Sequence, residues 1–121
     1  MEPEPKDPEY DRLKKMIATG PCLIKFTAHW CGPCQSIREE LEETCHSLGF
    51  KKIEIDVDVN KRISEYYEVT VLPTCIISSP GNNSVSVQGA NMNRIREAMR
   101  KMHTVEHGIT PIVVNSAIIH H

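Results

Sequence analysis

The chain has 121 residues, a length that fits one domain with a core large enough to fold without a disulfide framework. Its formal net charge of −2 creates no global field that would draw it to nucleic acid or to an anionic membrane. No apolar run approaches the roughly 20 residues that span a bilayer, so we expect neither kind of partner.

The N-terminus is acidic and rich in proline, unlike the apolar core of a secretory signal or the arginine-rich sequence of a transit peptide. We therefore expect residues 1–6 to be disordered and the protein to be cytoplasmic. The chain has five cysteines, an odd number that does not suggest a secreted disulfide framework. One functional pair and three reduced thiols are the expected arrangement.

The first helix is predicted to begin after Asp7, which is a favourable N-cap and precedes a proline. Its apolar face runs from Tyr10 to Ile17, and Gly20 ends it. Residues 22–28 then form a nearly continuous apolar run. Such a run is typical of a central strand that is covered on both faces.

The motif Trp30-Cys31-Gly32-Pro33-Cys34 follows this strand and opens a helical pattern. Two cysteines separated by two residues at such a junction form a redox motif when no metal ligands lie nearby. Gly32 allows the tight turn, and Pro33 fits the first helical turn, where its missing N–H costs nothing. Free N–H groups at the helix start favour the Cys31 thiolate, which is the nucleophile in disulfide exchange.

The helix that the motif opens is expected to run from 32 to 48, with Gly49 as its C-terminal cap. Apolar and charged residues alternate from Ile53 to Val59, which predicts a strand. A strand, a helix and a strand within about 38 residues form a βαβ unit, so these strands should be parallel.

The second half of the domain is expected to contain two helices and a hairpin. Asn60 caps a short helix. Strands at 74–79 and 84–88 are joined by residues 80–83, whose Pro-Gly-Asn-Asn sequence is a strong hairpin signal. The last helix opens at Asn91.

Three motifs resemble the thioredoxin family in both order and spacing. The motif around Cys31 resembles the family's active site, residues 71–74 resemble its cis-proline loop, and residues 86–91 resemble its last strand and glycine. The resemblance covers roughly residues 8–103. It implies an α/β, thioredoxin-like three-layer sandwich, with a mixed sheet of about four strands and helices on both faces. Because few residues precede the first helix, we expect the family's first edge strand to be missing.

The resemblance also divides the chain into a disordered segment 1–6, a thioredoxin-like domain 7–103 and an extension 104–121 of unknown structure. The extension is apolar and is expected to fold back, add a strand or contact a partner. In the family a proline often kinks the helix after the motif. Glu39 takes that place here, so we expect a straighter helix.

Lys25 is the informative departure from the family, which commonly has a buried Asp beneath the second cysteine. A buried ammonium is costly unless it is paired, and Glu54 on the neighbouring strand is the expected partner. A positive charge there favours the Cys34 thiolate and makes the redox couple more oxidising. The alternative is that the Lys25 side chain reaches water and leaves the cysteines unaffected.

The activity that the resemblance implies is protein-disulfide oxidoreduction. The Cys31 thiolate attacks a disulfide in a client protein, and Cys34 then attacks Cys31 and releases the client. Leu72 can offer backbone groups to an extended substrate, and the Pro73 peptide bond is expected to be cis. The expected substrate-binding residues are Trp30, Gly32, Pro33, Leu72, Pro73 and Gly89. Plain packing is the alternative role for Trp30.

Family members typically serve clients such as peroxiredoxins and are kept reduced by an NADPH-dependent thioredoxin reductase. No cofactor or metal is expected on this chain, because one cysteine pair lacks the four ligands that zinc takes. Cys22, Cys45 and Cys75 are expected to pack as small apolar residues, with a regulatory role open for Cys45. Two alternatives remain: a non-catalytic adaptor that docks through residues 104–121, and a metal or cluster carrier.

Overall fold

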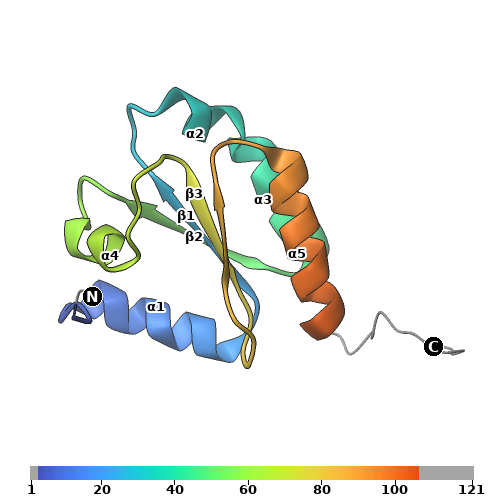
Figure 1. The fold of residues 1–121 in the computed structure, drawn as a ribbon, viewed down its shortest axis with the longest axis horizontal. Coiled ribbons are helices and arrows are strands. Elements are labelled where there is room, and N and C mark those ends of the chain that lie inside the picture. Colours follow the sequence, from blue (N-terminus) through green and yellow to red (C-terminus); the bar gives the residue numbers. More distant parts are fainter. Residues whose placement is uncertain (1–2, 107–121) are drawn as a thin grey trace, which may run out of the picture.

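The structure, a computed structural model, describes residues 3–106. In this range four strands form one mixed sheet in the order β2-β1-β3-β4 (Figure 1). Strand β1 (Cys22–Thr27) pairs in parallel with β2 (Lys51–Asp56) and antiparallel with β3 (Thr74–Ser78), which pairs antiparallel with β4 (Val85–Gln88). This confirms the predicted fold class, and no strand precedes the first helix within the described residues.

Helices cover both faces of the sheet (Figure 1). Helices α3 (Arg38–Leu48) and α5 (Met92–Glu106) lie on one face, and α1 (Pro8–Thr19) and α4 (Lys61–Tyr66) lie on the other. All six residues of β1 are buried, as predicted for a central strand. The sheet therefore separates two apolar cores, and the candidate site lies at one end of β1.

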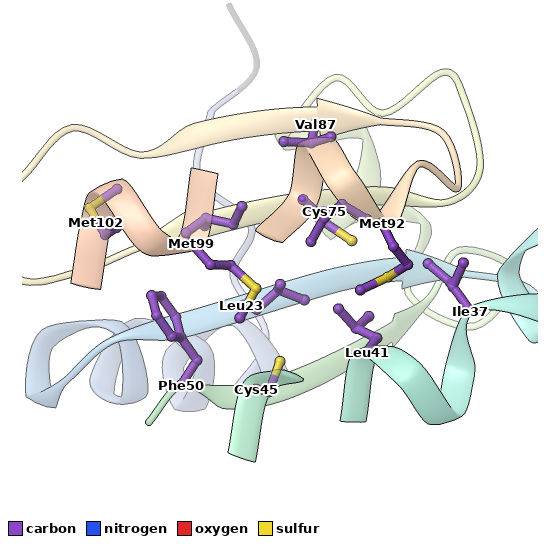
Figure 2. Close-up of a cluster of buried hydrophobic side chains, with 12 residues drawn as sticks. Leu23, Ile37, Leu41, Cys45, Phe50, Cys75, Val87, Met92, Met99 and Met102 are labelled. Atoms are coloured by element: carbon purple, nitrogen blue, oxygen red, sulfur yellow. The ribbon is translucent and has the colours of Figure 1, made fainter. Parts of the chain in front are cut away.

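The core beneath α3 and α5 is rich in sulfur and aliphatic side chains (Figure 2). Ile95, Met99 and Met102 are buried on the inner face of α5, as its helical periodicity predicts. They share this core with Leu23 of β1 and Leu41 of α3. Packing of these side chains fixes α3 against the sheet. It thereby also fixes the short helical segment that directly precedes α3 in the chain.

Within the segment 1–6, which was expected to be disordered, Glu4 contacts α1. The Tyr10 hydroxyl donates to the Glu4 carboxylate at 3.3 Å, and Lys14 Nζ lies 3.2 Å from the same carboxylate. Pro5 is buried. Asp7 caps α1 as predicted, because its side chain accepts the Tyr10 N–H at 3.0 Å.

Strand β2 ends at Asp56, earlier than the alternating pattern indicated. The Asp56 side chain accepts a hydrogen bond from the Asp58 N–H at 2.8 Å. The backbone carbonyl of Asp56 accepts the N–H groups of Val59 and Asn60 at 3.1 and 2.8 Å. These hydrogen bonds turn the chain out of the sheet. Val59 is consequently 76% exposed, although the alternation had placed it on the strand's apolar side.

The helix predicted from 32 to 48 is interrupted at Ile37, which separates α2 (Gly32–Ser36) from α3. Ile37 has φ −101° and ψ 6°, away from helical values. The Ser36 hydroxyl donates to the Pro33 carbonyl at 2.8 Å, a local side-chain bond of the kind that competes with the helical ladder and bends helices. The expectation of a straighter helix, based on Glu39, is wrong.

Helix α5 continues to Glu106, beyond the predicted domain end at residue 103. The rest of the predicted extension, residues 107–121, lies outside the described residues. None of the helices in the described part of the chain is long and apolar enough to cross a membrane.

Gly49, the C-cap of α3, provides a test of this fold because its φ of 76° is left-handed. Gly49→Ala should lower the free energy of unfolding by about 1–2 kcal/mol in urea denaturation, the cost of a left-handed Cβ. Gly20→Ala is the matched control, since both glycines have space around them but Gly20 has an extended φ of 174°. Equal effects of the two substitutions would contradict the observed cap.

Candidate active site

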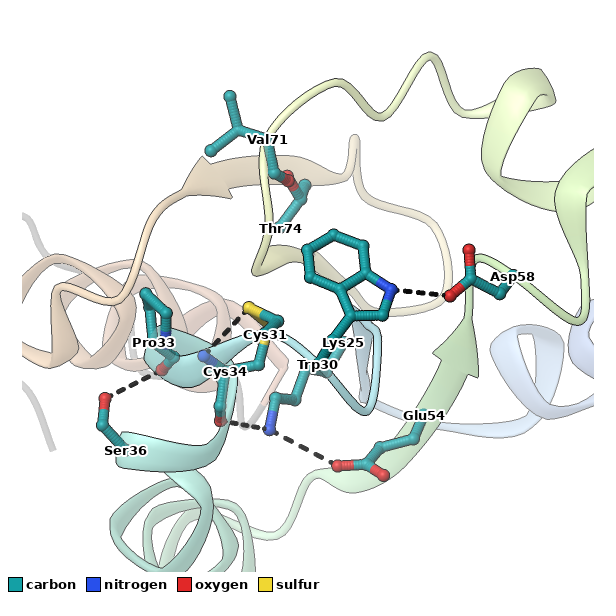
Figure 3. The surroundings of a disulfide bond; sticks show 10 residues. All are labelled: Lys25, Trp30, Cys31, Pro33, Cys34, Ser36, Glu54, Asp58, Val71 and Thr74. Carbon is teal, nitrogen blue, oxygen red and sulfur yellow. Dashed lines mark hydrogen bonds and ion pairs between the residues drawn. A yellow bond between two sulfur atoms is a disulfide. The ribbon is translucent and has the colours of Figure 1, made fainter.

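Cys31 and Cys34 form a disulfide at the junction between β1 and α2 (Figure 3). Their Cα atoms lie 5.3 Å apart. Cys31 is the N-cap of α2, and its sulfur accepts a hydrogen bond from the Cys34 backbone N–H at 3.2 Å. Cys31 is 4% exposed and Cys34 is fully buried, so an incoming group reaches the Cys31 sulfur first.

A groove of about 630 Å³ lies beside Cys31. Trp30, Pro33, Val57 and Leu72 contribute apolar side chains to its lining. Substrate binding was predicted for Trp30, Gly32, Pro33 and Leu72, and the structure brings all four to this groove. The arrangement can hold a polypeptide segment with one of its sulfur atoms next to Cys31.

Trp30 is 63% exposed, so the alternative of plain core packing is wrong. Its indole Nε1 donates to the Asp58 carboxylate at 2.8 Å (Figure 3). Asp58 lies on the turn after β2 and was not among the predicted site residues. The available signal was its place directly after a strand parallel to β1, since the carboxyl ends of parallel strands meet at one edge.

Pro73 and Gly89 are joined to each other by a backbone hydrogen bond. The Leu72–Pro73 peptide bond is cis, as the resemblance implies, and the Pro73 side chain is buried. The Gly89 N–H donates to the Pro73 carbonyl at 2.8 Å, with φ 92° at Gly89. Neither residue is among those that line the groove, whereas Leu72 lines it and packs against the buried cluster of Ala28, Cys31 and Cys34.

Lys25 lies buried beneath Cys34 and is only 1% exposed. Its Nζ donates to the Cys34 carbonyl at 2.9 Å and lies 3.4 Å from the Glu54 carboxylate (Figure 3). Lys25 and Glu54 are also register neighbours on β1 and β2. The predicted ion pair is therefore present and Lys25 does not reach water, while its bond to the Cys34 carbonyl is a contact that the sequence did not reveal.

Glu54 links the buried ammonium to the protein surface. Burial raises the pKa of the Glu54 carboxyl, but the charges and hydrogen bonds of Lys52 and Lys25 outweigh burial, so the pKa lies below its ordinary value of 4.5. Lys52 Nζ lies 3.3 Å from Glu54 and 3.0 Å from Glu42, which is mostly exposed. Positive and negative side chains therefore alternate from the buried Lys25 beneath Cys34 to the solvent-exposed Glu42.

The three other cysteines are buried and free. Burial raises the pKa of Cys45 to about 11 and that of Cys75 to about 12, and it also raises the pKa of Cys22. Such thiols stay protonated near neutral pH and are poor nucleophiles. Cys45 and Cys75 lie in the core beneath α3 and α5, where a cysteine packs as a small apolar residue. Across residues 3–106, no group of three or more His, Cys, Asp or Glu side chains could hold a metal ion.

Comparison with known proteins agrees with this geometry. The thioredoxin family model matches residues 6–101. A thioredoxin from Chlamydia pneumoniae is 36% identical over 80 residues, covering 65% of this chain and 78% of that protein. The oxidised mitochondrial thioredoxin 3 of Saccharomyces cerevisiae has a TM-score of 0.71 and 25% identity, covering 75% of this chain and 88% of that chain. The chain belongs to the thioredoxin family and is a thiol-disulfide oxidoreductase.

One further structural neighbour comes from a study of the thiol-resolving mechanism of a yeast mitochondrial 1-Cys peroxiredoxin via glutathione and thioredoxin systems. It has a TM-score of 0.70 and 24% identity, covering 75% of this chain and 88% of that chain. At 24% sequence identity, this similarity shows a shared fold and nothing further.

The Lys25–Glu54 pair predicts a pH-dependent contribution to stability. Because the folded pKa of Glu54 is lowered, the contribution is complete above the ordinary value of 4.5 and is lost as the pH falls through the folded pKa. Glu54→Gln should cost about 1–2 kcal/mol at pH 7, less than the 3–5 kcal/mol typical of a fully buried pair, because Glu54 is half-exposed.

Urea denaturation of both proteins between pH 7 and pH 3 measures this difference. Glu42→Gln is the matched control, because Glu42 pairs with Lys52 and is more exposed than Glu54. The free energies of unfolding of the Glu54 variant and the wild type should converge at low pH. A difference that persists unchanged to pH 3, or an equal loss in the control, would show that the pair is not its source.

Proposed function

We propose that this protein reduces disulfides in client proteins by dithiol–disulfide exchange, with Cys31 as nucleophile and Cys34 as resolving thiol. The observation that carries the proposal is the disulfide between a groove-lining Cys31 and a buried Cys34. Cys31 is suited to attack on a client because it lines the groove, and Cys34 is suited to an intramolecular second step because it is fully buried.

The reaction moves two electrons to the client. In the reduced protein, the Cys31 thiolate attacks one sulfur of the client disulfide, forms a mixed disulfide and releases the first client thiolate. The Cys34 thiol then gives up its proton and attacks the Cys31 sulfur. This closes the Cys31–Cys34 disulfide and releases the second client thiolate, and both client thiolates take protons from solvent.

The proposed clients are proteins with accessible disulfides, peroxiredoxins among them. The structural neighbour from the peroxiredoxin study supports this class of client at the level of fold. The oxidised protein requires a two-electron donor, and an NADPH-dependent thioredoxin reductase is the class that we propose. Three free thiols beside one redox pair suit a reducing compartment such as the cytoplasm.

Lys25 is proposed to tune the redox couple. Its ammonium sits beneath the cysteine that becomes a thiol or thiolate on reduction, and its 2.9 Å bond to the Cys34 carbonyl fixes it there. A fixed positive charge stabilises the Cys34 thiolate, so it stabilises the reduced form and raises the reduction potential. Glu54 moderates this effect because it offsets part of the charge.

Insulin reduction tests the proposed function. Wild-type protein with an excess of dithiothreitol should accelerate the precipitation of insulin chains, and Cys31→Ser should abolish the acceleration because the nucleophile is lost. Cys34→Ser should retain the attack but not the release. When the reduced variant is mixed with insulin after removal of dithiothreitol, it should accumulate a mixed disulfide that mass spectrometry detects. If the wild type is no faster than Cys31→Ser, the proposal fails. The adaptor role of residues 104–121, most of which lie outside the described residues, would then be favoured.

Reversal of the buried charge tests the tuning role of Lys25. Lys25→Asp should lower the reduction potential in a glutathione redox buffer, by about 30 mV for each 1.4 kcal/mol of lost thiolate stabilisation. The double variant Lys25→Asp/Glu54→Lys restores an ion pair with the charges exchanged, and it controls for simple destabilisation. An unchanged or higher potential in the folded Lys25→Asp protein would count against the role.

A further inference from the structure

We propose that a second cavity of this protein binds a zwitterionic α-amino carboxylate, carried by a free amino acid or by the γ-glutamyl end of a small peptide. This edge cavity, named for the edge strand β2, has a volume of about 450 Å³. Small-molecule sites in proteins typically have volumes of about 300–1,000 Å³. Its lining is mainly polar and includes Thr27, His29, Gln35, Arg38, Glu54 and Asp56.

The edge cavity is separate from the groove beside Cys31. Among the described residues, none lines both. His29 and Gln35 flank the Cys31–Cys34 disulfide in the sequence, and Glu54 is the partner of the buried Lys25 (Figure 3). A ligand in the edge cavity therefore lies near the redox pair and leaves the client groove open.

Opposite charges line the edge cavity without pairing. In the part of the chain that the structure describes, the exposed Arg38 guanidinium at the start of α3 has no hydrogen-bond or ion-pair partner. The Asp56 carboxylate, at the end of β2, accepts the Asp58 N–H but has no cationic partner there either. The charge of Glu54 is already offset by two lysines. The remaining cation and anion are complementary to a ligand that carries both a carboxylate and an ammonium.

Thr27 adds a buried hydroxyl that lacks a partner. It lies at the end of β1, opposite Asp56 in the β1–β2 register, and is 8% exposed. Within residues 3–106, its Oγ1 is the only buried side-chain oxygen or nitrogen without a hydrogen bond. An unpaired buried hydroxyl is destabilising, so a ligand that bonds to it recovers free energy on binding.

These three groups define the class of ligand. The Arg38 guanidinium suits a carboxylate, the Asp56 carboxylate suits an ammonium, and the Thr27 hydroxyl can donate or accept. The α-carbon of an amino acid carries both charged groups. A simple carboxylate or a simple amine, in contrast, leaves one charge of the cavity without a partner. Free amino acids and γ-glutamyl peptides share the required group.

NMR titration of the oxidised, ¹⁵N-labelled protein tests the proposal without any turnover, so its outcome is independent of the proposed disulfide exchange. L-Alanine should shift the amide signals of the cavity-lining residues in a saturable way. N-acetyl-L-alanine and L-alaninamide each lack one charge and should bind about ten-fold more weakly. No saturable shift with L-alanine or with S-methylglutathione, or equal binding of the singly charged compounds, would overturn the proposal.

S-methylglutathione, a redox-inert γ-glutamyl peptide, distinguishes the two sources of the zwitterion. Tighter binding than that of L-alanine supports a γ-glutamyl peptide as the ligand. Equal or weaker binding supports a free amino acid.

Arg38→Gln and Asp56→Asn should each weaken binding of the tighter zwitterion about ten-fold, because each removes one charge and keeps a polar side chain. The second variant also keeps an acceptor for the Asp58 N–H. Arg62→Gln and Asp11→Asn are the matched controls, since both residues are exposed and lie outside the edge cavity. Unchanged binding in the two cavity variants, or equal losses in the controls, would contradict the assignment.

Thr27→Val separates a binding role of the hydroxyl from a structural one. It should weaken binding of the zwitterion without lowering the free energy of unfolding in urea, because the hydroxyl makes no hydrogen bond in the unliganded protein. A loss of stability with unchanged binding would show that the hydroxyl serves the fold and not the ligand.

Discussion

The site depends on the hydrogen bond from the Cys34 backbone N–H to the Cys31 sulfur. This bond exists because β1 ends at Thr27 and α2 begins at Gly32, so that Cys31 is the N-cap of α2 and its sulfur faces the first turn of the helix. Of the two cysteines, Cys31 therefore has a backbone donor aimed at its sulfur and an opening to the groove. The direction of the chemistry follows from this asymmetry, since the sulfur that can hold negative charge is also the sulfur that clients reach.

The buried charge beneath Cys34 is compatible with the fold because its partners come from regular structure. Lys25 and Glu54 face each other through the β1–β2 register, and the Cys34 carbonyl in α2 accepts a hydrogen bond from the ammonium. A buried ammonium without such partners would cost several kcal/mol.

Features that arise from local pattern or from sheet register could be predicted from the sequence. The βαβ unit and the hairpin are of this kind, whereas the pairing of Lys25 with Glu54 was predicted from the family resemblance. Features that depend on individual side-chain hydrogen bonds could not. The helix breaks at Ile37 although no proline marks the position, and Trp30 meets Asp58 from a loop 28 residues away, which neither periodicity nor motif spacing encodes.

The most direct test of the central claim is the rate at which Cys31 of the reduced protein is alkylated by iodoacetamide as a function of pH. Mass spectrometry of the digested protein separates Cys31 from Cys34 and from the three buried thiols. The account predicts that alkylation of Cys31 reaches half its maximal rate well below about pH 8.5, the value for an ordinary thiol, and that Cys31 reacts before every other cysteine. A midpoint at or above that pH, or a rate no faster than that of Cys34, would contradict it.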